Sequence, residues 1–147
     1  MVGLTIRRAV PADAPRMVAL FEAWGYGAPA PEIEARLEAW EAMRDAEVLF
    51  AELDGAAAGF VAVCATPHLA RAGWFGRVTG LAVDVAFRRQ GVGRALVEAA
   101  EQLARTWGCD RVEICTSRSR PESSGFYAGL GYEDVCARSA RFIRALG

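Results

Sequence analysis

Lysine is absent from this chain of 147 residues, so all 17 of its strongly basic side chains are arginines. This absence excludes a lysine nucleophile, a Schiff base and the lysine of a Walker phosphate loop. Histidine occurs once, as His68, and none of the four cysteines belongs to a CxxC pair, so we expect no metal site. We expect reduced thiols, with Cys64 and Cys115 packed inside strands as small hydrophobic groups.

Long apolar runs and a strong net charge are also missing. No run approaches the roughly 20 residues of a membrane span. A net charge of −1 gives no reason to expect nucleic acid or an anionic membrane as a partner. Residues 1–9 predict a strand and lack the apolar segment of a signal peptide, so we expect a cytoplasmic protein. The length suits one domain over residues 1–147.

The charge that is present is unevenly distributed. Residues 13–54 contain ten acidic side chains and three arginines, whereas residues 71–147 contain twelve arginines and eight acidic side chains. This division fits a site that receives a cation from one side and an anion from the other. Solvated helix faces are the alternative for most of these residues.

Hydrophobic spacing and the positions of glycine and proline predict alternating strands and helices. Helices are expected from the Asp13 cap to Trp24, around Ile33 to Met43, over 94–107, and from a Ser119–Glu122 capping box to Gly129. Strands are expected at 4–9, 48–53, 57–66, 75–83, 110–116 and, as one strand or a pair, 132–142. The order implies an α/β fold with a mixed sheet and helices on both faces.

The strongest functional signal is a glycine-containing loop that joins an expected strand to the longest expected helix. The first turn of a helix has unpaired N–H groups and a partial positive charge. Gly91 and Gly93 allow close approach of the backbone to a ligand, and arginines at 88, 89 and 94 add positive charge. The loop therefore predicts a phosphate site, the alternative being a glycine pair that merely starts a tight helix.

Two motifs resemble the GNAT superfamily of N-acetyltransferases. Arg88-x-x-Gly91-x-Gly93 is similar to the coenzyme A loop of that superfamily. A second segment is similar to the other signature of the superfamily: Phe126-Tyr127-Ala128-Gly129-Leu130-Gly131-Tyr132. One expected helix and one expected strand separate the motifs, and the order of elements matches over nearly the whole chain. The resemblance implies one N-acetyltransferase domain, a twisted mixed sheet that splays between its central strands, and acetyl-CoA as cosubstrate.

The same resemblance implies roles for individual residues. The backbone of Leu81, Ala82 and Val83 is expected to pair with the pantetheine arm, and a backbone N–H near Val83 to bind the oxyanion. Tyr127 is expected near the coenzyme sulfur as the general acid. The pyrophosphate is expected at Arg88, Arg89, Gln90, Gly91, Val92, Gly93 and Arg94.

The general base departs from the family pattern. Arg77 stands where many relatives carry a glutamate, and a guanidinium cannot accept a proton. Glu113 on the following strand is the candidate that we put first. Asp84, His68 and a chain of water molecules remain as alternatives.

The acceptor is expected to contact the loops 24–31 and 68–74. Trp24, Tyr26 and Trp74, together with His68 and nearby acids, would suit an ammonium compound. A place in the core or in a lid is the alternative for both tryptophans.

We expect direct attack on acetyl-CoA, in a ternary complex, by a primary amine. The expected acceptor is a cationic small molecule of the amino sugar or polyamine type. A peptide or protein acceptor and a non-catalytic acyl-CoA-binding regulator are the alternatives. The resemblance also implies a homodimer through the terminal strands.

Overall fold

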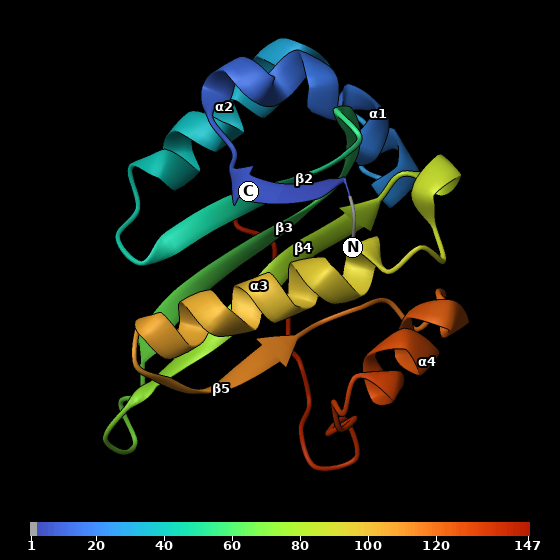
Figure 1. The fold of residues 1–147 in the computed structure, drawn as a ribbon. Coiled ribbons are helices and arrows are strands. Elements are labelled where there is room, and N and C mark those ends of the chain that lie inside the picture. The colour runs from blue at the N-terminus through green and yellow to red at the C-terminus, as the bar shows by residue number, and fades with distance from the viewer. Residues whose placement is uncertain (1–2) are drawn as a thin grey trace. The chain divides into compact units, whose positions relative to one another are not determined.

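The computed structural model describes residues 3–147, which fall into two compact units, one ending at Ile114 and one running from Cys115 to Gly147. The second unit contains one helix, α4 (Pro121–Gly129). The elements of the first unit are β1 (Leu4–Arg8), η1 (Pro11–Asp13), α1 (Ala14–Trp24), α2 (Ala30–Glu41), β2 (Ala46–Leu53), β3 (Ala56–Pro67), β4 (Trp74–Val83), η2 (Val85–Phe87), α3 (Val92–Thr106) and β5 (Cys109–Ile114) (Figure 1).

The five strands of the first unit form one mixed sheet in the order β1-β2-β3-β4-β5. The first four strands are antiparallel neighbours, and β5 runs parallel to β4. A parallel neighbour needs a crossover connection, and α3 supplies it. The expected α/β fold with a mixed sheet is confirmed.

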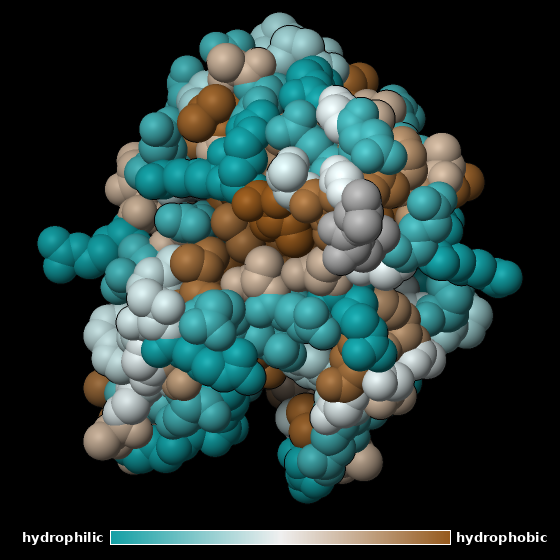
Figure 2. All heavy atoms as spheres, viewed as in Figure 1, coloured by the Kyte–Doolittle hydropathy of each residue, from teal (hydrophilic) through white to brown (hydrophobic). Residues whose placement is uncertain are grey.

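Helices cover both faces of this sheet. Buried residues of α1 and α2 pack with Phe50, Phe60 and Ala82 in one cluster. Buried residues of α3 form a second cluster with the opposite side chains of the strands, including Val61 and Val78. Hydrophilic residues cover the outward side of α3 (Figure 2), as an amphipathic helix on a sheet requires.

The start of α1 differs from its expected form. Asp13 precedes the helix, but its side chain makes no cap hydrogen bond to it. The carboxylate instead accepts hydrogen bonds from the Val10 N–H and from Arg7. The Asp13 carboxylate therefore bonds Arg7 and the Val10 N–H, both upstream of α1, in place of the N–H groups at the start of the helix.

The second unit lacks the expected last strand. Residues 130–147 have no helix or strand after α4. Local bonds hold part of this segment in turns: Asp134 accepts from the Cys136 N–H, and the Arg138 N–H donates to Val135. Asp side chains favour such turns over extended backbone because they compete for the N–H groups that a strand would use.

Two smaller expectations in this part of the chain were also wrong. The N-cap of α4 is Arg120, with no side-chain cap bond, and the Ser119 hydroxyl instead bonds the hydroxyl of Ser117. Cys115 is exposed and lies beyond the end of β5, although Cys64 is half-buried within β3 as expected. Within residues 3–147, no helix has the length and apolar character needed to cross a membrane.

Candidate functional site

The pairing of β4 with β5 ends halfway along β4. The last paired residues are Val78 and Ile114, whereas β4 continues to Val83. Within the part of the chain that the structure describes, no strand pairs with residues 79–83 on the β5 side. This stretch, which contains Leu81, Ala82 and Val83, is a strand edge that an extended ligand could extend by backbone hydrogen bonds.

A β-bulge in β4 coincides with the end of that pairing. Val78 pairs with Val63, and Gly80 pairs with Ala62, so Thr79 is an additional residue between them. Side chains of a regular strand alternate between faces, so positions 78 and 80 would face the same side. Instead, Val78 packs with α3, and a Cβ on Gly80 would meet Trp24 of α1. Beyond the bulge, the side chains of β4 therefore alternate in the opposite phase, so that position 80 faces α1.

Beyond β4, a tight loop leads into α3. Asp84 accepts a hydrogen bond of 2.8 Å from the Ala86 N–H and caps η2. Arg89 and Gly91 have φ of 62° and 83°, the left-handed region that glycine adopts at low cost. Gly91 is the N-cap of α3 and provides no side chain to cap it. The first N–H groups of α3 have no partner within the helix and would suit an anion.

Basic side chains surround this helix start. The Arg88 Nε donates to the Val83 carbonyl at 3.4 Å, and the Gln90 Nε2 donates to the Ala86 carbonyl at 3.2 Å. Arg89 and Arg94 are exposed, and the first turn of α3 contains no acidic residue. The loop therefore combines positive side chains with the positive end of the helix dipole.

A cavity of about 530 Å³ lies on the other side of β4, between the sheet and the helices α1 and α2. Its volume is in the range of small-molecule sites, about 300–1,000 Å³. The cavity reaches β4 at the bulge residue Thr79 and includes the expected acceptor residues Trp24 and Tyr26. Its other lining residues are Met17, Phe21, Gly27, Ile33, Arg36, Leu37, Trp40, Val48, Phe60 and Ala62.

Aromatic rings shape this cavity. The Trp24 ring packs edge-on against Phe21, Tyr26 and Phe60, with centroids 5.6, 4.7 and 5.4 Å away. A Cβ on Gly80 would lie 2.9 Å from two atoms of the Trp24 ring, so only glycine fits beneath it. Trp24 is therefore both a core residue and a wall of the cavity.

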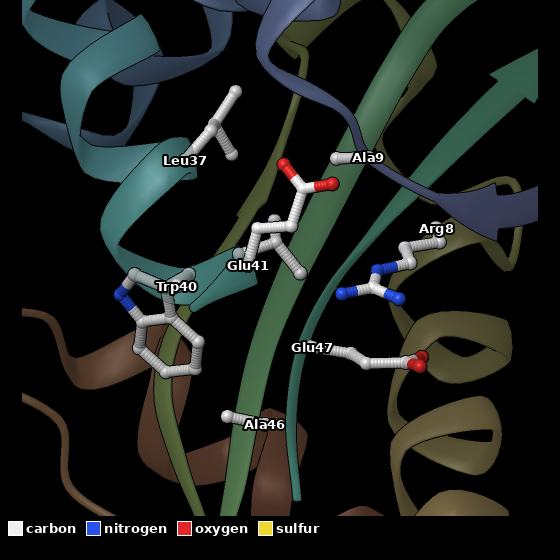
Figure 3. A pocket seen from close by; sticks show the side chains of 8 residues that line it. Arg8, Ala9, Leu37, Trp40, Glu41, Ala46 and Glu47 are labelled. Carbon is white, nitrogen blue, oxygen red and sulfur yellow. The ribbon is translucent and has the colours of Figure 1, made fainter. Parts of the chain in front are cut away.

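A second cavity, of only about 10 Å³, lies beside the larger one and shares Leu37, Trp40 and Val48 with it. Figure 3 shows Leu37 and Trp40 on α2, with Arg8 and Glu47 across from them. This volume is close to the minimum for one water molecule. It is too small for an acceptor.

Glu113 lies beside Arg77, because these residues are partners in the β4–β5 register. Their side chains form an ion pair, Nη2 to Oε2, at 3.4 Å. Gly76 faces α3, so Arg77 faces the opposite side, on which the cavity lies. Paired residues of neighbouring strands share a face, which places the Glu113 carboxylate on the cavity side of the sheet.

His68 and Trp74 lie apart from the cavity. Neither lines it, and both are at the turn where β3 meets β4. The His68 Nε2 is 3.2 Å from an Asp110 oxygen, and Arg71 contacts both residues. This cluster pins the β3–β4 turn to the start of β5.

Two of the alternative bases therefore have structural partners. Asp84 caps η2, and His68 belongs to the cluster with Arg71 and Asp110. Glu113 also has a partner, Arg77, and its position on the cavity side of the sheet, one residue before the β4–β5 pairing ends, keeps it as the first candidate.

Tyr127 lies on α4 in the second unit. Its ring packs edge-on against Phe126 and Tyr132, with centroids 5.1 and 6.1 Å away. Burial raises the pKa of its phenol above 10, and Arg120 opposes this shift only in part. The hydroxyl therefore carries its proton at neutral pH and can donate it.

Sequence reasoning missed the contribution of α2 to the cavity. Ile33, Leu37 and Trp40 have the spacing of a helix face, which predicts burial but not a cavity, and Arg36 looks like an ordinary surface residue. No local signal marks the bulge at Thr79 either, because a bulge is defined by the register with β3. Among the described residues, no group of three or more His, Cys, Asp or Glu side chains could hold a metal ion.

Known proteins resemble this chain in sequence and in fold. Aminoalkylphosphonate N-acetyltransferase of Salmonella typhimurium is 31% identical over 93 residues, which cover 63% of this chain and 58% of that protein. A GNAT family acetyltransferase of Staphylococcus aureus has a TM-score of 0.82 at 16% identity, with 99% of this chain and 100% of that chain covered. Glucosamine-6-phosphate N-acetyltransferase of Arabidopsis thaliana has a TM-score of 0.77 at 20% identity, with 98% and 99% covered. The two structural likenesses show a common fold.

The family assignment rests on a match to the family as a whole. The model of the acetyltransferase (GNAT) family matches residues 15–132, a range that includes both motifs and parts of both compact units. The resemblance seen in the two motifs is thereby confirmed. The chain belongs to the acetyltransferase (GNAT) family, whose members use acetyl-CoA as cosubstrate.

Proposed function

We propose that the chain is an acetyl-CoA-dependent N-acetyltransferase that acetylates a primary amine on a small molecule. The observation that carries the proposal is the arrangement around β4. One edge of β4 is open from Thr79 to Val83, a phosphate-type loop follows it, and a cavity reaches the bulge from the face covered by α1 and α2. A cosubstrate and an acceptor can therefore approach the same strand by separate routes.

The coenzyme is assigned to the open edge and the loop. The pantetheine arm would pair with the backbone of Leu81, Ala82 and Val83 as an added strand. The pyrophosphate would bind at the start of α3, where Gly91 lets the backbone come close. The side chains of Arg88, Arg89, Gln90 and Arg94, with the backbone of Val92 and Gly93, would complete this site.

Acetyl transfer needs two proton movements. A free amine has a pKa near 10 and arrives mostly protonated, so a base must remove a proton before or during attack. We assign this step to Glu113, directly or through water. The nitrogen then bonds to the carbonyl carbon, and a backbone N–H near Val83 stabilises the oxyanion.

The second proton movement completes the reaction. When the C–S bond breaks, the electron pair leaves with sulfur, and Tyr127 donates its proton to the thiolate. A thiol has a pKa of about 8.5, below that of a phenol, so this donation is only modestly uphill. The acetylated nitrogen releases its second proton, which water carries to the Tyr127 phenolate. Glu113 loses its proton to solvent, and coenzyme A leaves as the thiol.

The acceptor is assigned to the cavity bounded by Trp24 and Tyr26. The aromatic rings offer stacking and cation–π contact to an amine. Glu22 also lies beside the cavity wall, since a Cβ on Gly27 would be 2.8 Å from its carboxylate. These features support an amine that enters as an ammonium ion.

The test is a coupled assay of coenzyme A release with a panel of amines, together with calorimetric titration of acetyl-CoA. The panel includes arylalkylamines, amino sugars, polyamines and a peptide with a free N-terminus. We expect acetyl-CoA to bind without acceptor and at least one primary amine to release coenzyme A above the hydrolysis rate. Acetyl-CoA binding without turnover for any amine would instead support an acyl-CoA-binding regulator, and no binding would overturn the proposal.

A further inference from the structure

The charge of the cavity beside α2 does not suit a polycation. Among the described residues that line it, Arg36 is the one side chain with a full charge, and most of the others are aliphatic or aromatic. Glu22, beside Gly27 and outside the lining, can balance one ammonium group but not several. A polyamine or an amino sugar would bring several ammonium or hydroxyl groups into this apolar surface beside an arginine. Each group without a partner would carry a desolvation cost of at least about 1–3 kcal/mol.

Arg36 has hydrogen-bonding capacity beyond its contact within the chain. A guanidinium carries five N–H donors. Among the described residues its partner is Glu32, one helical turn away, at 3.5 Å, and the two side chains are 53% and 60% exposed. An exposed ion pair at this distance is weak, so a bound anion can compete with it.

Two walls of the cavity differ in chemistry. The sheet wall includes Thr79 of β4, beside the open strand edge assigned to the thioester. Arg36 lies on a different element, α2, which forms the opposite wall from the sheet. An acceptor oriented with its amine toward β4 would present the rest of its body to the aromatic rings and to the guanidinium.

Resting on the proposed acetyl transfer, we propose that the acceptor is an amine with an apolar aryl or branched alkyl body and an anionic group, and that Arg36 binds this anion. The anion is a carboxylate or a phosphonate, because both offer the two oxygen atoms that a guanidinium binds as a pair. The apolar body fills the space between Trp24, Phe60 and Trp40, where burial of its surface contributes most of the affinity.

The experiment compares two amines of similar size that differ in the remote group. They are 4-(2-aminoethyl)benzoate, which carries a carboxylate, and 4-methylphenethylamine, which carries a methyl group instead. With wild-type protein and saturating acetyl-CoA, we expect a higher kcat/KM for the benzoate. Arg36→Gln should lower that value by about 10- to 100-fold, mainly through KM, because a charge-assisted hydrogen bond is lost. The value for the methyl compound should change less than about twofold.

Two further variants separate a specific contact from a general effect of charge. Arg44→Gln removes the same charge from the turn that follows α2, outside the cavity lining, and should leave both values nearly unchanged. Glu32→Gln removes the partner of Arg36 and should raise kcat/KM for the benzoate. Equal losses for both amines in Arg36→Gln, or a preference of the wild type for 1,4-diaminobutane, would overturn the inference.

Binding of the benzoate to the coenzyme A-bound protein provides a readout that needs no turnover. If no amine is acetylated, the proposed function fails, yet an Arg36-dependent affinity for the benzoate would still support the anion site. An affinity that is the same in Arg36→Gln and wild type would overturn the anion site whether or not the protein acetylates amines.

Discussion

The guanidinium of Arg7 and the carboxylate of Asp13 form a two-point ion pair, with Nη1–Oδ2 at 2.9 Å and Nη2–Oδ1 at 2.8 Å. Asp13 is 6% exposed and also accepts the Val10 N–H at 2.8 Å. Arg7 extends over the Phe50 ring, 5.1 Å from its centroid, and its Nε donates to Glu52. The pair connects β1 to the start of α1, the helix that forms one wall of the cavity between the sheet and the helices.

Removing the charge of Asp13 should therefore destabilise the fold. We expect Asp13→Asn to lower the free energy of unfolding by about 1–3 kcal/mol, because Arg7 loses its partner and a buried bond network is broken. Urea unfolding followed by circular dichroism measures this loss. Glu34→Gln removes an equal charge from an exposed position on α2 and should change stability by less than about 0.5 kcal/mol. Equal stability of the two variants would contradict a structural role of the pair.

The same pair predicts how stability depends on pH. The hydrogen bonds from Arg7 hold the pKa of Asp13 below its ordinary value of 3.8, and Arg16 acts in the same direction on the pKa of Glu52. A carboxylate with a depressed folded pKa contributes stability above its unfolded pKa, and this contribution is lost as pH falls through the folded pKa. The Tm difference between wild type and Asp13→Asn should be constant from pH 7 to about 5 and shrink below about pH 4. A constant difference down to pH 2 would argue against this linkage.

Substitutions at Gly91 and Gly108 separate the effect of a blocked binding site from the effect of backbone strain. Gly91→Val places a β-branched residue at φ 83° and should abolish acetyl-CoA binding in calorimetric titration, because the side chain blocks the start of α3. Gly108→Val introduces similar strain at φ 81°, just after the same helix, where a Cβ meets nothing within 4 Å. Both variants should lose stability, and only the first should lose acetyl-CoA. If both variants lost acetyl-CoA binding, backbone strain and not a blocked site would explain the loss.

A substitution at Gly80 tests the proposed acceptor cavity, because Gly80 lies against the Trp24 ring that forms one of its walls. In Gly80→Ala, the new Cβ would lie 2.9 Å from the Trp24 ring and would push this wall. We expect KM for the amine to rise at least about threefold while the Kd of acetyl-CoA stays within about twofold of wild type. Gly129→Ala, whose Cβ meets nothing within 4 Å, is the matched control. An effect on acetyl-CoA alone would place the amine somewhere else.

Tyr127→Phe keeps the ring and removes only the proton donor. We expect turnover to fall by about 10- to 1000-fold with acetyl-CoA affinity nearly intact, since a general acid acts in the transition state. Tyr132→Phe removes a hydroxyl from the neighbouring ring and should leave turnover within about threefold of wild type. Unchanged turnover in Tyr127→Phe would exclude the donor role. Loss of folding would favour a packing role.

Several features of the fold could be predicted because local interactions decide them. The apolar stripe of α3, which includes Leu96 and Ala100, is buried as its spacing predicts. The strand, glycine loop and helix around Gly91 also occur in the expected order. The segment at 132–142 was predicted wrongly because its turn-forming Asp134 outweighs its apolar residues.

The acceptor contact expected at loop 68–74 stays a prediction. His68 and Trp74 lie at the turn that Asp110, a residue far along the chain, holds in place, and neither lines the cavity between the sheet and the helices. An ion pair between such distant positions leaves no periodic signal in the sequence. The sequence also gives no sign that Arg36 lines a cavity, because its charge and spacing match an ordinary exposed helix position.

The sequence by itself determined the family and the type of cosubstrate, because the glycines and arginines of residues 88–94 act within one short loop and one helix start. Only the tertiary structure decided the cavity to which we assign the acceptor. The bulge at Thr79 exists only in the register of β4 with β3, and the cavity exists only where α1 and α2 pack over the sheet. Both depend on contacts between residues distant in sequence, and local propensity carries no information about those contacts.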